Sequence, residues 1–271
     1  MTAPGLDEDG HIAREGSLDR VPTAFAGVVA DARARIGALF GPARLHSAYL
    51  YGSVPRGTAT PGVSDLDLLL ALRRPPTAAD RADATALAAG LDADHPVIDG
   101  AGILLFDVDT LLGELERHDL GWFVACLCTP LLGEDLAAGL PRYRPTSLLA
   151  RETNGDLAGL LPRWREQLAA ARTDAETRTL ARAVGRRVVR TGLTLVMPRW
   201  GGWTSDLDIS AEVFGRYYPE RSGQLRLAAD LARRPSADRA ALTVLIDDLG
   251  PWLAAEYAAV HGVKAPRPTG P

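Results

Sequence analysis

Two short segments hold the residue types best suited to chemistry: Gly52-Ser53 and, after a loop of eleven residues, Asp65-Leu66-Asp67. In a strand, residues two apart point to one face, so both carboxylates would meet there while Leu66 enters the core. Carboxylate oxygens are the ligands that Mg²⁺ prefers, and converging carboxylates can hold two ions about 4 Å apart. Gly52 lets the backbone approach a phosphate closely, and the Ser53 hydroxyl and nearby amides can donate to its oxygens. Together the segments predict a site for a metal-bound phosphate group.

Arg56, in the loop between these segments, is a further candidate for phosphate binding. Its guanidinium is suited to grip the β- or γ-phosphate of a nucleotide through paired hydrogen bonds. A loop arginine that only faces solvent is an equal alternative. The two interpretations differ in where the loop places the side chain.

The elements that must position these residues alternate between helix and strand. We expect helix, strand, loop, strand, helix, strand and helix, in that order, over residues 17–40, 45–51, 52–63, 66–72, 77–91, 96–106 and 109–116. Such alternation predicts an α/β (α+β) domain with a small mixed sheet over residues 1–143. Pro141 and Pro145 bracket the linker that follows it.

The remainder of the chain, residues 144–271, has the periodicity of a separate, all-α helical bundle. Apolar spacing indicates helices over residues 148–171, 174–191, 205–217, 223–232 and 237–260. Glycine and proline mark the breaks between them, at Pro198, Gly201-Gly202, Pro219 and Pro235. The chain is therefore predicted to have two domains.

The composition favours a globular protein outside the membrane. A hydrophobic fraction of 46% and a charged fraction of 24% argue against long disorder. The net charge of −4 excludes a protein that is basic throughout. No apolar run reaches the roughly 20 residues that cross a bilayer, and the N-terminus is polar and acidic. We expect a cytoplasmic protein, by default a monomer.

The combination of motifs resembles the nucleotidyltransferase superfamily that contains DNA polymerase β. The resemblance is carried by the strand end Leu50-Tyr51-Gly52-Ser53, the Arg-Gly loop, and Ser64-Asp65-Leu66-Asp67 before an aliphatic strand. Within that superfamily the sequence is most similar to bacterial aminoglycoside adenylyltransferases of the streptomycin/spectinomycin type, and the helical C-terminal part extends the likeness loosely over most of the chain. The resemblance implies transfer of AMP from ATP to an antibiotic hydroxyl, with two Mg²⁺ ions and with the substrate held between the domains.

The resemblance also implies a third carboxylate on the next strand, as a metal ligand or as general base for the acceptor hydroxyl. Asp99 is the candidate, because it precedes Gly100-Ala101-Gly102 and shares strand parity with Ala101 and Ile103. Aligning the apolar run with the family's pattern puts the acid nearer Ala101 instead. The alternatives are therefore Asp99 and a vacancy at Ala101.

Contacts from the helical domain are implied at a stripe of arginines. Arg182, Arg186 and Arg190 recur every four residues on one predicted helix face, with Arg187 beside them. In similar enzymes basic residues of this domain reach the triphosphate, which makes Arg186 and Arg187 candidate nucleotide-binding residues. A solvated helix face is the alternative.

A cationic acceptor would need acidic groups and an aromatic wall. By resemblance, Trp122 falls near the position of a substrate-stacking tryptophan, and Asp174 and Glu176 lie where the family offers acids. Core packing of Trp122 and helix N-terminal charges for the two acids are the alternatives.

Three hypotheses follow. The favoured one is a Mg²⁺-dependent adenylyltransferase acting on a small hydroxylated molecule, most similar in its motifs to enzymes of antibiotic resistance. The second keeps the chemistry but makes tRNA or a protein the acceptor, because residues 141–199 hold twelve arginines against five acidic residues. The third is a nucleotide-binding protein without catalysis, motivated by the ambiguous third carboxylate.

Overall fold

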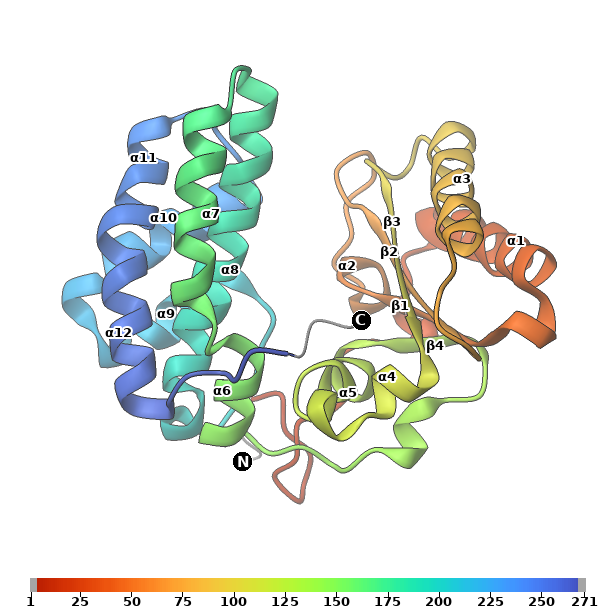
Figure 1. Cartoon of the computed structure of the whole chain (residues 1–271), viewed down its shortest axis with the longest axis horizontal. Helices are drawn as coiled ribbons and strands as arrows, with labels where there is room; N and C mark the ends of the chain where they lie inside the picture. Colours follow the sequence, from red (N-terminus) through yellow and green to blue (C-terminus); the bar gives the residue numbers. More distant parts are fainter. Residues whose placement is uncertain (1–3, 268–271) are drawn as a thin grey trace. The chain divides into compact units, whose positions relative to one another are not determined.

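The structure, a computed structural model, describes residues 4–267, which divide into two units (Figure 1). Residues 13–143 form an α/β unit, and residues 144–267 form a helical unit. Residues 4–12 belong to the helical unit by their contacts, since the Trp203 amide donates to the Pro4 carbonyl over 2.9 Å. The predicted fold class, an α/β domain followed by an all-α one, is confirmed.

A mixed four-stranded sheet forms the centre of the α/β unit, in the order β3-β2-β1-β4. Its strands are β1 (Leu45–Tyr51), β2 (Leu66–Leu72), β3 (Ala101–Asp107) and β4 (Thr129–Gly133). β1 is antiparallel to β2 and β4, whereas β3 is parallel to β2. Parallel neighbours need a long crossover, and here a helix supplies it. The strand order places β3 at an edge of the sheet, directly beside β2, the strand that carries Asp67.

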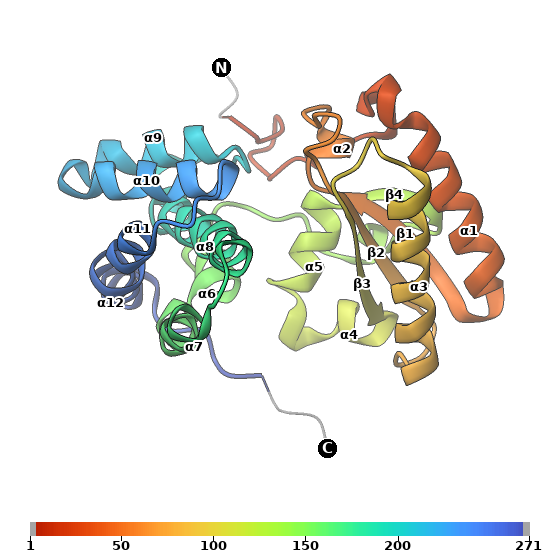
Figure 2. The same ribbon diagram turned by 90° about the horizontal axis from the view of Figure 1, so that it is seen from above.

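Helices cover both faces of this sheet (Figure 2). They are α1 (Ala26–Arg44), α2 (Ser53–Arg56), α3 (Ala78–Asp94), α4 (Val108–Leu112) and α5 (Leu120–Trp122). Leu66, Leu68 and Leu70 of β2 are buried in the core that α1 and α3 complete. Leu69 and Ala71 are buried in a second core, on the side of α4 and α5. The aliphatic run of β2 thus serves both cores, as a strand covered on two sides must.

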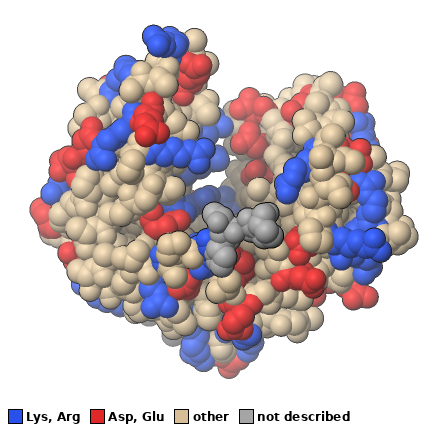
Figure 3. Space-filling model, viewed as in Figure 1, with Lys and Arg blue, Asp and Glu red and all other residues tan. Residues whose placement is uncertain are grey.

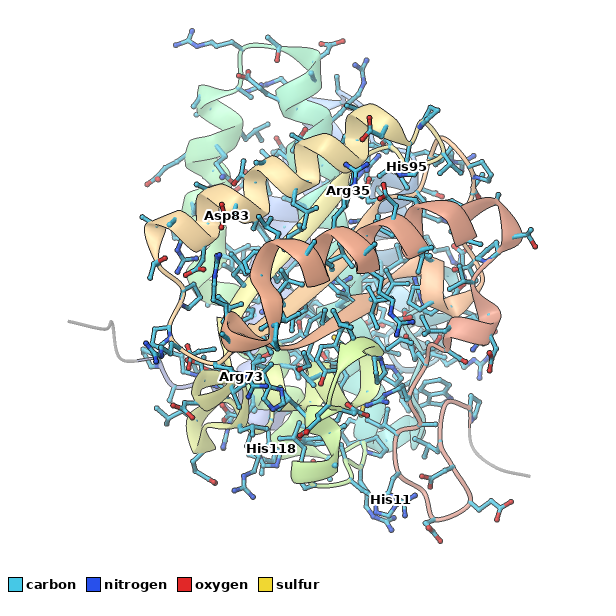
Figure 4. The ribbon with its side chains drawn as sticks, turned by 90° about the vertical axis from the view of Figure 1, so that its right-hand side faces the viewer. His11, Arg35, Arg73, Asp83, His95 and His118 are labelled. Atoms are coloured by element: carbon cyan, nitrogen blue, oxygen red, sulfur yellow. The ribbon has the colours of Figure 1, made fainter. Side chains whose placement is uncertain are left out.

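Asp31 of α1 joins this helix to the end of α3 through Arg35 and His95, which Figure 4 labels. Its carboxylate lies 2.7 Å from the Arg35 guanidinium and 2.6 Å from Nε2 of His95, the residue that caps α3. Hydrogen bonds from His95 and Arg35 lower the pKa of Asp31. The Arg35 guanidinium also lies 2.6 Å from Asp94, so the two helices are joined on the sheet's outer layer.

The helical unit differs from the prediction in where its helices break. It contains α6 (Ser147–Asn154), α7 (Leu157–Ala170), α8 (Asp174–Trp200), α9 (Leu207–Tyr217), α10 (Ser222–Arg233), α11 (Arg239–Thr243) and α12 (Gly250–His261). α8 continues past its predicted end at Thr191 because its last turns are buried, and Pro198 lies within the final turn. Within residues 4–267, no helix combines the length and apolarity that crossing a bilayer requires.

His261, the last residue of α12, joins three helices of this unit. Its Nδ1 lies 2.6 Å from Oγ of Ser147 in α6, and its Nε2 lies 2.9 Å from the carbonyl oxygen of Leu195 in α8. A carbonyl can only accept, so Nε2 donates to Leu195 and Nδ1 accepts from the Ser147 hydroxyl. Burial lowers the pKa of His261, because the charged imidazolium would lose its hydration.

Stability should therefore depend on pH through this histidine. The unfolded chain protonates His261 near pH 6.5, whereas the folded chain resists protonation to lower pH. The contribution of neutral His261 to the free energy of unfolding is fully present above about pH 6.5. It is lost as the pH falls from there through the lower pKa of the folded state. We expect the thermal midpoint, measured by circular dichroism at pH 7.5 and pH 5.0, to fall less in His261→Gln than in the wild type. Equal falls in both proteins would contradict this role, because all other titrating groups are shared.

Candidate functional site

Asp65 and Asp67 lie at the start of β2. Asp67 is the second residue of the strand and points to the same face as Leu69, opposite to the buried Leu66. Asp65 directly precedes the strand, and both aspartates are half-buried. The cross-strand partners of Asp67 are Tyr51 on β1 and Gly102 on β3. The alternation predicted from the sequence, with carboxylates on one face and Leu66 in the core, is thus present.

Gly52 places the loop that follows β1 against the Asp67 carboxylate. It follows β1 with φ 81° and ψ −149°, a backbone conformation that is strongly unfavourable for any residue with a side chain. A Cβ at this position would lie 2.5 Å from Oδ2 of Asp67, closer than non-bonded atoms approach. Ser53, half-buried, is the first residue of α2, where amides lack an acceptor within the helix. Glycine is therefore required at position 52 both by the turn and by the carboxylate.

Arg56 forms a hydrogen bond within this loop. Its Nε donates to the Gly52 carbonyl oxygen over 2.9 Å, and the side chain is half-buried. On the other side of the same turn, the amide of Ser17 donates to the Pro55 carbonyl over 3.0 Å. Arg56 is thus a part of the loop's own hydrogen bonding, which neither of the two sequence interpretations included.

Asp99 lies just before β3 and is exposed. Its amide donates to the Ser64 carbonyl over 3.1 Å, and this bond joins the segments that precede β3 and β2. Ala101, which shares its strand parity, packs against the core of α1 and α3, on the face opposite to Asp67. Parity therefore does not direct Asp99 toward the two carboxylates.

Metal-ligating side chains come together in one other place. In the part of the chain that the structure describes, the one group of three with ligand atoms within 4.8 Å of one another is Asp7, Asp9 and His11. Asp99 does not form such a group with Asp65 and Asp67. The Asp7 carboxylate accepts the amides of Asp9 and His11, both over 3.0 Å, so hydrogen bonds of a turn account for this cluster.

Two glycines that the sequence analysis did not assign to the site border the carboxylates. A Cβ on Gly100 would lie 3.8 Å from Oδ1 of Asp65, and one on Gly102 would lie 3.5 Å from Oδ1 of Asp67. The position on β3 that faces the carboxylates is therefore Gly102, and not Ala101 as the alignment of apolar runs indicated. The visible signal was the alternation Gly100-Ala101-Gly102 at the start of an aliphatic strand.

The loop after β1 and the start of β2 lie in a segment that matches a known family. Residues 37–101 match the family model of the nucleotidyltransferase domain, a stretch that includes Gly52, Ser53, Asp65 and Asp67. The chain carries a nucleotidyltransferase domain. The superfamily and enzyme class predicted from the sequence are thereby confirmed.

The chain is also similar to solved structures. A search of curated proteins gave no match. Among solved structures, the chain is similar to the crystal structure of spectinomycin adenyltransferase AAD(9) from Enterococcus faecialis with ATP and spectinomycin. The sequences are 14% identical, the match covers 84% of this chain and 98% of that chain, and the TM-score is 0.48.

Outside the nucleotidyltransferase domain, the arginine stripe lies on α8. Arg186 and Arg190 are exposed, and Arg182 is half-buried. Arg187 is half-buried and forms an ion pair with Asp156, which precedes α7. Arg186 and Arg190 are thus exposed residues of the stripe, whereas Arg187 is paired with a carboxylate of its own unit.

Of the residues predicted to bind a cationic acceptor, one is buried and two interact with neighbouring residues of the chain. Trp122, in the same unit as the nucleotidyltransferase domain, is only 6% exposed. Glu176 accepts the amides of Arg172 and Thr173 in a capping box at the start of α8, and these bonds lower its pKa. Asp174 lies 3.3 Å from the Arg178 guanidinium and stays exposed. Asp174 and Glu176 are thus both exposed, and Trp122 is buried.

Proposed function

We propose that the chain transfers AMP from ATP, with Mg²⁺, to a hydroxyl group of a small molecule. The observation that carries this proposal is the placement of the Asp67 carboxylate against the Gly52 backbone, beside Asp65, inside the matched nucleotidyltransferase domain. Nucleotidyl transfer as the reaction class follows from the family match. ATP, Mg²⁺ and the acceptor are the proposed part.

The residues present fit a divalent cation. Asp65 and Asp67 supply the carboxylate oxygens that Mg²⁺ prefers, and the missing Cβ of Gly52 leaves room at Oδ2 of Asp67. When bound, Mg²⁺ neutralises phosphate charge and lowers the pKa of a coordinated hydroxyl. The two aspartates would hold it.

The loop residues would bind and orient the triphosphate. Ser53 can donate its hydroxyl and amide to phosphate oxygens, and Gly52 allows the close approach. Arg56 keeps the loop in this shape through its bond to the Gly52 carbonyl. Because the phosphates are held in place before reaction, little entropy remains to be lost at the transition state.

For the acceptor, we propose an aminoglycoside-type antibiotic, on the basis of the sequence resemblance. The resemblance implies Asp174 and Glu176 as the acids for a cationic group, and the Asp174 side chain is exposed. Since ATP is a cytoplasmic co-substrate, we also propose that the enzyme acts in the cytoplasm, and we expect a monomer in solution.

A nucleic-acid acceptor is less well supported by the arginine-rich segment. Ion pairs engage four of its arginines: Arg151 with Glu152, Arg165 with Asp247, Arg178 with Asp174, and Arg187 with Asp156. On the face shown in Figure 3, acidic side chains lie among the basic ones over the helical unit. A phosphate backbone would need basic groups without such neutralising partners.

The proposal is tested with ATP, Mg²⁺ and a panel of aminoglycosides. We expect pyrophosphate release and a product heavier by AMP, detected by mass spectrometry, and we expect Asp65→Asn to abolish both. Turnover with GTP in place of ATP would revise the nucleotide. Absence of turnover with every panel member would remove the antibiotic as acceptor and leave the reaction class standing.

A further inference from the structure

The strand beside the two carboxylates has no side chain where it faces them. β3 runs parallel to β2 in a register that pairs Asp67 with Gly102. Residues on this face of β3 alternate, and they are Gly102, Leu104 and Phe106, with Gly100 directly before the strand. None of these residues carries an oxygen ligand.

The glycine at position 102 is not required by the backbone. Its φ lies outside the left-handed region, unlike that of Gly52. A Cβ there would meet Oδ1 of Asp67 at 3.5 Å, an ordinary van der Waals contact, with no other heavy atom within 4 Å. A Cβ would therefore fit at residue 102 and would lie next to Asp67.

Ligand supply limits how many cations the site can hold. Mg²⁺ demands octahedral coordination, which carboxylates, triphosphate oxygens and water can complete around one ion. A second ion about 4 Å away needs further anionic oxygens to offset its charge. Among residues 4–267, no third histidine, cysteine, aspartate or glutamate has a ligand atom within 4.8 Å of the carboxylate oxygens of both Asp65 and Asp67.

We propose that this site takes one divalent cation together with the nucleotide, and that Gly102 is the residue that limits it to one. The inference rests on the proposed function, and it replaces the two ions implied by the sequence resemblance. A carboxylate introduced at residue 102 supplies the missing ligand and creates a second cation position.

Manganese binding to the full chain tests this proposal without relying on turnover. Mn²⁺ replaces Mg²⁺, and a non-hydrolysable ATP analogue with a methylene group between the α- and β-phosphorus atoms keeps the complex intact. We expect one bound Mn²⁺ per chain and an electron paramagnetic resonance spectrum without coupling between manganese ions. In Gly102→Asp, we expect two Mn²⁺ per chain and a coupled spectrum.

Two control variants separate the position of the new group from its charge. Gly102→Asn has nearly the shape of Gly102→Asp without its charge and should still bind one ion. Leu104→Asp places a carboxylate on the same face one step further along β3, at a residue that is 38% exposed, and should also bind one. Thermal melting shows which variants fold, and the wild-type measurement decides the number of ions even if Gly102→Asp does not fold.

Each contrary outcome has a distinct meaning. Two coupled Mn²⁺ ions in the wild type would overturn the inference alone. A folded Gly102→Asp protein that still binds one ion would overturn the role given to Gly102. No Mn²⁺ bound to the wild type in the presence of the nucleotide would overturn the inference and the proposed function together.

Discussion

Replacing Asp67 with asparagine is expected to lower kcat/KM for nucleotidyl transfer by about 10²–10³-fold, the scale seen when one group that stabilises developing charge is removed. Asparagine keeps the shape of the side chain but loses the negative charge that a divalent cation needs from its ligands. The cation in turn neutralises the phosphates during transfer. Steady-state kinetics with ATP measure the effect, and circular dichroism shows whether the fold is retained.

Asp99→Asn is the matched control for this variant. The substitution is the same, but Asp99 is exposed and shares strand parity with Ala101, whose side chain packs on the opposite face of the sheet. We expect kcat/KM to change less than about threefold, as for an exposed side chain outside the site. If Asp99→Asn lost as much activity as Asp67→Asn, Asp99 would be the third carboxylate that the family resemblance implies. If Asp67→Asn kept activity within tenfold of wild type, the metal site proposed here would be wrong.

Gly52→Ala is expected to weaken nucleotide binding at least tenfold and to destabilise the fold. The new Cβ would lie 2.5 Å from Oδ2 of Asp67, so either the loop or the carboxylate must move. The backbone, at φ 81° and ψ −149°, adds strain of about 1–3 kcal/mol for a residue with a side chain. Isothermal titration with the ATP analogue gives the dissociation constant, and denaturant titration gives the free energy of unfolding.

Gly62→Ala separates backbone strain from the collision with Asp67. Gly62 lies in the same loop, also with positive φ, 68°, but a Cβ there would meet no atom within 4 Å. Its cost should be the backbone strain alone, about 1–2 kcal/mol, with the dissociation constant unchanged within twofold. A Gly62→Ala protein that binds nucleotide as weakly as Gly52→Ala would mean that general loosening of the loop, and not the approach of Asp67, explains the loss.

The parts of the site that follow from local spacing could be predicted from the sequence. Asp65 and Asp67 are two residues apart at the start of an aliphatic run, and strand geometry alone puts them on one face. The run itself predicted burial on both sides, which Leu68 and Leu69 show by entering different cores. Gly52 and Ser53 were identified because a turn must follow the buried strand β1.

The neighbouring strand could not be placed from spacing alone. A shift of one residue in the pairing of β3 with β2 exchanges the faces of Ala101 and Gly102, and the sequence of β3 is apolar on both faces. The register is set by tertiary contacts, including the bond from the Leu66 amide to the Gly100 carbonyl over 2.8 Å. The sequence therefore leaves Asp99 and Ala101 as alternatives and does not indicate Gly102.

Helix boundaries in the helical unit show the same limit. The prediction ended a helix at Thr191, with a break at Pro198, whereas α8 extends to Trp200. Leu195, Val196 and Met197 are fully buried, so packing stabilises turns whose local sequence indicates an end. Gly201 caps the helix after Trp200, and its φ of 69° is the left-handed conformation common after helices.

The central claim, that the α-phosphorus of ATP is the atom attacked, is tested most directly by following the label of two radioactive substrates. With an acceptor that supports turnover, ATP labelled with ³²P at the α-position should transfer its label to the product. ATP labelled at the γ-position should leave all of its label in pyrophosphate. Label from the γ-position in the product would mean phosphoryl transfer, and would contradict nucleotidyl transfer at Asp65 and Asp67.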